Sequence, residues 1–341
     1  MMLLHGLMEY ALFLAKVVTG VLAIIAVLLA ISGVSRRQRT PEGSLELKHL
    51  NGKFRQFRLQ LQEQLLSGKA LKKLYKDEKK ADKAKEAAHT ADQAKVFVLR
   101  FEGDLRASAV AHLREEITAL LQVARPEQDR VVLCLESPGG MVHGYGLAAS
   151  QLQRLRQARL NLVVCVDKVA ASGGYMMAAL GDRIVAAPFA IVGSIGVVAQ
   201  LPNINRLLKR HDIDIELHTA GAYKRTLTLL GENTEAGRRK FQEELEDTHV
   251  LFKEFVHEAR PQVDVERVAT GEHWYGQRAL ALGLIDEIST SDDYLSRQCE
   301  HAEVYELSFN LPQPWLQRLT GSLSAGMQQG LEKLLSIRFI A

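Results

Sequence analysis

The 341-residue chain lacks the motifs of several common classes of binding protein. It has no histidine or cysteine spacing typical of zinc sites, no Walker loop and no glycine fingerprint for dinucleotides, so no metal and no cofactor is expected. A net charge of +3 is too small to indicate nucleic-acid binding. Its three cysteines, Cys134, Cys165 and Cys299, follow no motif. Cys134 and Cys165 lie in apolar runs, which favours buried structural thiols.

Charged residues are missing from one long stretch near the N-terminus. Residues 17–34 form an apolar run of 18 residues, and with residues 11–14 and a snorkelling Lys16 the run is long enough to cross a bilayer. A cleaved signal peptide is the alternative, but the positive charges follow the run and no small-x-small site closes it. We therefore expect residues 1–34 to be a retained single-pass anchor in a lipid bilayer.

The charges around this run bear on its orientation. Arg36, Arg37 and Arg39 follow it, whereas residues 1–10 contain no Lys or Arg. The positive-inside rule therefore places the bulk of the chain in the cytoplasm.

The next segment, residues 35–95, is rich in alanine, lysine and acidic residues. This composition predicts a solvated charged helix or a partly disordered spacer. Attraction of the lysines to anionic lipid head groups is the alternative interpretation.

From residue 96 to 290 the pattern alternates between apolar strands and amphipathic helices. We predict strands at 96–103, 131–135, 162–166, 183–187 and 213–218, and helices at 108–123, 145–159, 205–210 and 234–259, the last with Thr234 as N-cap. Near-continuous Val, Leu and Ile strands that alternate with helices predict an α/β fold whose parallel sheet is covered on both faces. Residues 291–341 form a C-terminal extension with an amphipathic helix over 312–340.

Two predicted strands end in turns that suit catalysis. The segment 131–140 ends in SPGG, and the segment 163–179 carries Ser172 on a tight turn before a helix. Because ligands of such sheets bind at the C-terminal ends of the strands, we expect the two turns to share one site. Ser172 is the candidate nucleophile. The backbone N–H groups of Gly140 and Gly173 are the candidate oxyanion hole, with Gly139 as the alternative to Gly140.

A serine nucleophile needs a general base. Lys224, in the sequence GAYKR, is the candidate, and Ser194 in GSIG is the candidate to orient its amine. A lysine has an ordinary pKa of ~10.4, so work near neutrality requires a fall of roughly 3 units, or about 4 kcal/mol, which burial among apolar groups can supply. His143 is the alternative base, although no orienting acid stands at a recognisable spacing.

These motifs together resemble one family of enzymes. SPGG at 137–140, ASGGY at 171–175, GSIGV at 193–197 and the pair Tyr223 and Lys224 are similar to the signal peptide peptidase A family of bacterial serine proteases. The sequence GEHWYGQRALALGLIDEI at 271–288 resembles the family's segment after the catalytic lysine. The match covers about residues 96–288, and the anchor, spacer and single catalytic domain are most similar to its SohB-type members.

The resemblance implies a ClpP/crotonase-like fold, a β-β-α spiral, at residues 96–290. It also implies a Ser–Lys dyad with Ser172 as nucleophile, Lys224 as base and Ser194 as the residue that orients the lysine. The family forms homo-oligomeric rings and cleaves apolar peptides, including signal-peptide remnants in the bacterial inner membrane. Its catalytic domains lie on the periplasmic side, opposite to the side that the charges favour here.

The sequence leaves two other functions open. One is a crotonase-like acyl-CoA enzyme, which would use the paired N–H groups without a serine nucleophile. The other is a catalytically inactive scaffold that organises membrane proteins through its long helices. The presence of both Ser172 and Lys224 favours the serine endopeptidase.

Overall fold

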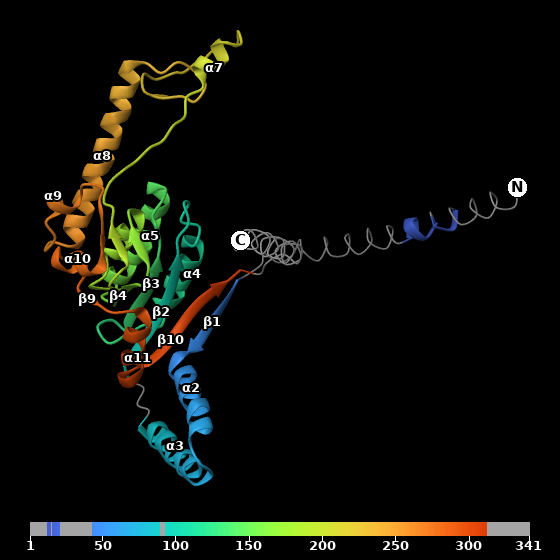
Figure 1. The fold of residues 1–341 in the computed structure, drawn as a ribbon, viewed down its shortest axis with the longest axis vertical. Helices are drawn as coiled ribbons and strands as arrows, with labels where there is room; N and C mark the ends of the chain where they lie inside the picture. Colours follow the sequence, from blue (N-terminus) through green and yellow to red (C-terminus); the bar gives the residue numbers. More distant parts are fainter. Residues whose placement is uncertain (1–11, 15, 21–42, 89–92, 312–341) are drawn as a thin grey trace, which may run out of the picture. The chain divides into compact units, whose positions relative to one another are not determined.

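The computed structural model describes residues 12–14, 16–20, 43–88 and 93–311 (Figure 1). By its contacts the chain divides into residues 45–309 and a second unit made of the two terminal segments, and the fold below is that of residues 45–309. The predicted anchor at 1–34 lies outside the described residues except for 12–14 and 16–20, and the predicted helix at 312–340 lies wholly outside them. In the described part of the chain, no helix combines the length and the apolar character needed to cross a bilayer.

A seven-stranded sheet forms the centre of the domain, in the order β1-β10-β2-β3-β4-β6-β9. Neighbouring strands from β10 to β9 are parallel throughout. The predicted strands at 96–103, 131–135, 162–166 and 183–187 are all confirmed. The strands are β1 (Ser44–His49), β2 (Lys95–Glu102), β3 (Arg130–Glu136), β4 (Asn161–Val166), β6 (Arg183–Ala186), β9 (Glu287–Ile288) and β10 (Glu303–Asn310).

Helices cover both faces of this sheet, as predicted. Successive residues of a strand point to opposite faces, so Leu99 and Phe101 of β2 join one apolar core and Val96 and Val98 join the other. The first core contains α4 (Val110–Leu120), α5 (Val142–Gln157) and α6 (Gly173–Ala178), and the second contains residues of α2 (Leu50–Leu65) and α11 (Ser291–His301). The chain is therefore a mixed α/β protein.

The cysteines have the structural character that the sequence predicts. All three are free thiols, and Cys134 and Cys165 are register partners on β3 and β4. Burial raises the pKa of Cys134 to about 11. A thiol in such surroundings is a packing group and a poor nucleophile.

A second, three-stranded sheet brings the two predicted turns together. It consists of β5 (Val169–Ala171), β7 (Ile191–Gly193) and β8 (His273–Tyr275), with β5 parallel to β7 and β7 antiparallel to β8. The end of β3 joins it, because the Ser137 N–H donates to the Val169 carbonyl at 2.8 Å and the Ala171 N–H donates to the Ser137 carbonyl at 3.0 Å. These bonds fix the SPGG turn beside the turn that carries Ser172.

The segments around the central domain contribute more structure than their composition indicates. The predicted charged segment 35–95 contains strand β1 at the sheet edge and two helices, α2 and α3 (Gly68–Ala88). The predicted extension 291–341 contains α11 and the strand β10, which lies between β1 and β2 in the sheet. Strand pairing between distant segments leaves little trace in composition, so the sequence pattern alone did not reveal it.

One predicted strand is wrong. Residues 213–218 have the apolar alternation of a strand, but they form none and are exposed. Alternation makes a strand only where a neighbouring strand satisfies its backbone groups, and this segment has no such partner among the described residues. The flanking helices are confirmed as α7 (Asn205–Lys209) and α8 (Glu235–Ala259), and the Thr234 hydroxyl caps α8 by accepting from the Gly237 N–H at 3.0 Å. Two short helices follow, α9 (Val265–Val268) and α10 (Gly276–Ala281).

Candidate active site

Ser172 occupies a strained turn between β5 and α6. Its backbone has φ 53° and ψ −121°, a conformation that costs a non-glycine residue about 1–3 kcal/mol. Two hydrogen bonds hold it there: the Ser172 N–H donates to the Gly193 carbonyl at 2.8 Å, and the Ser172 carbonyl accepts from the Met176 N–H at 3.0 Å. Strain that the surrounding structure maintains in this way is typical of functional positions.

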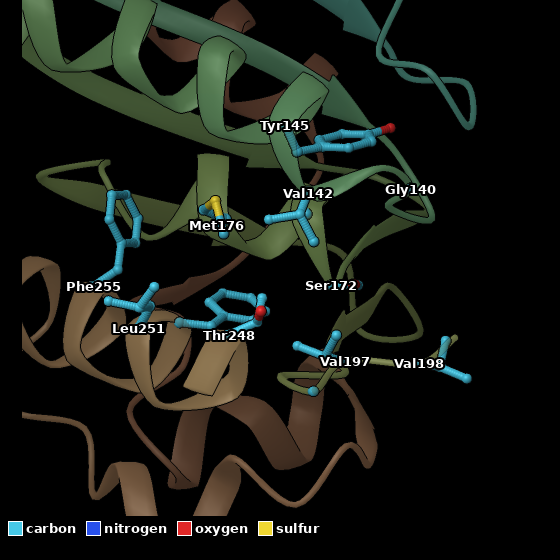
Figure 2. A pocket seen from close by; sticks show the side chains of 13 residues that line it. Gly140, Val142, Tyr145, Ser172, Met176, Val197, Val198, Thr248, Leu251 and Phe255 are labelled. Carbon is cyan, nitrogen blue, oxygen red and sulfur yellow. The ribbon is translucent and has the colours of Figure 1, made fainter. Parts of the chain in front are cut away.

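A cavity of about 280 Å³ opens beside Ser172 (Figure 2). In Figure 2, Leu251 and Phe255 of α8 lie across the cavity from Met176 of α6. Most of the lining is apolar, so the cavity suits an apolar side chain next to the serine. It is lined by Gly140, Val142, Tyr145, Ser172, Gly173, Met176, Gly196, Val197, Val198, Thr248, Leu251, Phe252 and Phe255.

Two backbone N–H groups of the cavity wall are available to a ligand. Gly140 and Gly173 both line the cavity, and neither N–H donates to an acceptor within the described part of the chain. The Gly139 N–H, by contrast, donates to the Ser137 hydroxyl at 3.1 Å. Of the two turn glycines, Gly140 therefore has the N–H that remains without an acceptor among the described residues.

Glycine is required at these turns because they pass close to each other. At Gly139, which has φ +89°, a Cβ would lie 2.7 Å from both the Ala171 carbonyl oxygen and the Ser172 Cβ. At Gly173, a Cβ would lie 2.3 Å from the ring of Tyr145. Neither position has room for a side chain.

Tyr145 holds the SPGG turn in place through hydrogen bonds. Its buried hydroxyl donates to the Asp104 carbonyl at 2.8 Å and lies 2.5 Å from the Ser137 hydroxyl. Since the tyrosine proton is committed to Asp104, Ser137 donates to Tyr145 and accepts from Gly139. Burial raises the pKa of Tyr145, which keeps this hydroxyl protonated at neutral pH. The chain of hydrogen bonds fixes the backbone that presents the Gly140 N–H.

Lys224 does not line the serine cavity. It is exposed and lines a second cavity, of about 390 Å³, with Leu201, Phe241 and Glu244. Neighbouring parts of the same two segments line the two cavities. Residues 196–198 and α8 from Thr248 onward line the first, while residues 199–201 and α8 up to Glu244 line the second. Thr248 and Glu244 are one helical turn apart, which is about 6 Å along the axis. The lysine cavity therefore adjoins the serine cavity along α8.

Comparisons with known proteins identify the family of the chain. The model of the peptidase family S49 N-terminal region matches residues 5–152, and that of peptidase family S49 matches residues 154–305. The probable protease SohB of Haemophilus influenzae is 49% identical over 320 residues, which cover 91% of this chain and 90% of the relative. The chain belongs to peptidase family S49.

Two further similarities were found, one to a sequence relative and one to a solved structure. The probable protease SohB of Buchnera aphidicola subsp. Acyrthosiphon pisum is 46% identical over 330 residues, which cover 96% of this chain and 97% of the relative. Among solved structures, a mutant of the 1510-N membrane-bound stomatin-specific protease in complex with a substrate peptide covers 68% of this chain, with 14% identity and a TM-score of 0.39. The S49 assignment rests on the sequence relatives, and it makes the chain a peptidase.

Two further candidate residues of this S49 peptidase, Ser194 and His143, do not line the serine cavity. Ser194 follows β7 with φ 51° and is half-buried, and its hydroxyl makes no hydrogen bond within the described residues. It does not line the serine cavity, although Gly196 two residues later does. His143, the alternative base, is exposed and also does not line the cavity, whereas its neighbours Val142 and Tyr145 do.

Two features of the serine cavity are not evident from the sequence. The first is the wall that α8 supplies through Thr248, Leu251 and Phe255. Its apolar stripe is visible in the sequence, but a stripe does not tell a packing face from a cavity wall. The second is the support that Tyr145 gives to Ser137. Only the close packing of α5 against the turn reveals this role.

Proposed function

We propose that this S49 peptidase is a membrane-anchored serine endopeptidase that hydrolyses apolar peptides with a Ser–Lys dyad. The observation that carries the proposal is the strained Ser172, which lies at an apolar cavity beside two backbone N–H groups without acceptors. Ser172 is the nucleophile and Lys224 the general base. We assign the fold to the ClpP/crotonase-like spirals, because β4, β5 and α6 follow one another and β6 and β7 repeat the first two steps.

The proposed reaction proceeds through an acyl-enzyme. The Ser172 oxygen attacks the peptide carbonyl carbon while its proton passes to the neutral lysine amine. The negative oxygen of the tetrahedral intermediate accepts from the N–H groups of Gly140 and Gly173. The C–N bond then breaks, and the leaving amine takes the proton from the lysine. A water molecule repeats the sequence on the ester and restores the serine.

Lys224 would reach the serine of a neighbouring protomer in a ring. It is exposed and lies in the adjoining cavity of its own chain. The segment that carries it also exposes many large apolar side chains, as expected of a surface that a second copy covers. These are Leu201, Ile204, Leu207, Ile213, Ile215, Leu217, Tyr223, Leu229 and Leu230. Ser194, whose hydroxyl makes no hydrogen bond within the described residues, would orient the amine.

Residues 17–34 would hold the ring at the bacterial inner membrane, where apolar peptides such as signal-peptide remnants and membrane proteins are the substrates. The arginines after the run favour a cytoplasmic catalytic domain, and the resemblance to the signal peptide peptidase A family favours a periplasmic one. Protease protection of the domain in intact spheroplasts would distinguish the two sides.

Mixing two inactive variants tests the dyad and the ring together. Ser172→Ala and Lys224→Ala should each abolish cleavage of an apolar fluorogenic peptide by the purified full chain in detergent. Co-assembled from equal amounts, they should regain roughly a quarter of the wild-type activity, because a shared site combines an intact serine and an intact lysine in one case of four. A Ser172→Ala/Lys224→Ala double variant mixed with Lys224→Ala should regain none.

Other outcomes would change the assignment. Cleavage by Lys224→Ala alone would exclude Lys224 as the base and favour His143. Inactive mixtures of assembled single variants would place both residues of the dyad in one protomer. Absence of cleavage by a folded wild-type oligomer would favour the inactive scaffold, whereas binding of acyl-CoA without hydrolysis of peptides would favour the crotonase-like alternative.

A further inference from the structure

Helix α2 carries an apolar stripe that the domain covers only in part. Leu50 and Phe54, at the start of α2, pack into the second core. Phe57, Leu61 and Leu65 continue the same face of the helix, since residues three or four apart align. Their side chains are 51%, 63% and 80% exposed. The stripe thus begins buried and extends into solvent.

The base of this element is firmly attached to the domain. The Asn51 amide donates to the carbonyls of Cys299 and Ala302 at 2.9 and 2.8 Å, and its oxygen accepts from the Val304 N–H at 2.7 Å. These bonds join α2 to the end of α11 and the start of β10, next to which α2 begins in Figure 1. The direction in which the stripe leaves the domain is therefore fixed.

Helix α3 packs on a different face of α2. Glu78 of α3 forms ion pairs with Arg55 and Arg58 of α2, and Tyr75 donates to Glu63. Arg55 and Glu63 point away from the face of Phe57, Leu61 and Leu65 by helical geometry. The second helix of the hairpin accordingly leaves the stripe open.

The hairpin is strongly basic although the chain is nearly neutral. Residues 50–88 contain 11 Lys or Arg and 5 Asp or Glu, a net charge of +6, against +3 for the whole chain. The remainder of the protein is therefore net negative. Lys53 of α2 lies over the ring of Phe57, 5.7 Å from its centroid. The exposed lysines of α3 make no ion pair with a described residue. They are Lys69, Lys72, Lys73, Lys76, Lys79 and Lys80.

An anionic bilayer surface matches this combination better than a protein partner does. A stable protein interface buries roughly 800 Å² on each side, more than three side chains of one helix offer. A helix that lies in the membrane interface needs only one apolar face with basic flanks. Each lysine near an anionic surface adds to the electrostatic attraction. Residues 17–34 end sixteen residues before α2 begins, so the proposed anchor would keep the hairpin near the bilayer.

We infer that the α2–α3 hairpin docks on the anionic lipid surface through Phe57, Leu61 and Leu65, with the α3 lysines adding electrostatic attraction to that surface. Docking orients the domain, because the stripe is continuous with residues that the second core holds. The closeness of the hairpin to the bilayer rests on the membrane anchor of the proposed function. The docking itself does not depend on the Ser–Lys dyad.

Fluorescence quenching by brominated lipids tests this inference. The full chain carrying Leu61→Trp is reconstituted in vesicles of phosphatidylcholine alone or with phosphatidylglycerol, and the signal of the unsubstituted chain, with its two native tryptophans, is subtracted. The introduced tryptophan should shift to the blue and lose fluorescence in the anionic vesicles, and recover as salt rises. Gln56→Trp, exposed on another face of α2, is the matched control and should remain unquenched.

A charge variant completes the test. Lys72→Glu, Lys73→Glu and Lys76→Glu combined with Leu61→Trp should lose the quenching, while peptide cleavage in detergent stays at the wild-type rate. Quenching that is absent in both lipids, or equal for Leu61→Trp and Gln56→Trp, would overturn the docking surface. Protection of Leu61→Trp from aqueous quenchers in detergent would mean that a second protein copy covers the stripe. Binding of the unsubstituted chain to neutral vesicles reports the anchor separately.

Discussion

The Ser137 hydroxyl accepts a hydrogen bond from the Gly139 N–H at 3.1 Å, and so removes this N–H from the set that a substrate can use. The next N–H along the turn, that of Gly140, lacks an acceptor among the described residues and lines the cavity beside Ser172. Ser137 therefore has a positioning role in the proposed reaction although it touches no substrate.

Ser137→Ala should lower kcat about 10-fold to 100-fold with little change in KM. The variant lets the turn relax and misplaces the Gly140 N–H, and the loss of a whole oxyanion donor costs about 100-fold to 1,000-fold. Steady-state kinetics with an apolar fluorogenic peptide measures the effect. Ser137→Thr keeps the hydroxyl and should recover part of kcat. A fall in activity that appears only in KM would contradict the role.

Ser172→Gly should be inactive but more stable than Ser172→Ala by about 1 kcal/mol. Glycine relieves a backbone strain of about 1–3 kcal/mol at φ 53°, and its greater freedom in the unfolded chain cancels about 0.5–1 kcal/mol of that gain. Thermal or urea unfolding of the two inactive variants measures the difference. Equal stabilities would mean that the strain at Ser172 is no larger than the entropic cost of glycine, about 0.5–1 kcal/mol.

Leu251→Ser should raise the KM for apolar peptides about 10-fold and leave kcat almost unchanged. Leu251 lines the cavity and is 59% exposed, so its replacement should change the stability of the folded state little. An apolar substrate residue bound in the cavity would lose about 1.5 kcal/mol of binding free energy. Val250→Ser is the matched control, because Val250 is 45% exposed on the same helix and does not line the cavity. An equal effect of both substitutions would exclude a specific contact.

Glu116→Gln should stabilise the protein by on the order of 1 kcal/mol at neutral pH and not in acid. Glu116 is 5% exposed, and one carboxylate oxygen accepts from the Phe309 N–H at 2.9 Å while the other has no partner among the described residues. Burial raises its pKa, so the folded state favours the neutral carboxyl.

The direction of the pH dependence follows from this shift. The stability that the neutral Glu116 provides is complete below the ordinary pKa of 4.5 and is lost as pH rises through the folded pKa, because the folded state then binds the extra proton. Urea unfolding from pH 4 to 8 should show wild type and Glu116→Gln diverging as pH rises. Glu115→Gln, which changes a partly exposed neighbour, should remain parallel to wild type.

The sequence predicts the parallel sheet and the serine turn because both have local causes. A run such as that of β3 is apolar at almost every position since both faces are covered, and the small residues around Ser172 permit a tight turn. The places of β1 and β10 were beyond prediction, because their pairing joins residues that are more than 250 positions apart. The separation of Lys224 from the serine cavity was equally hidden, since order along the chain does not fix which cavity a loop lines.

Helix α8 lines both cavities, Thr248 to Phe255 facing the serine and Phe241 and Glu244 facing the lysine. In the proposed ring, each α8 would then serve its own nucleophile at one end and the nucleophile of its neighbour at the other. A peptide that tilts this 25-residue rod on binding would move the base of the adjacent site. Binding of a peptide at one site would thereby change the activity of the next site. A plot of cleavage rate against substrate concentration would then deviate from a simple hyperbola.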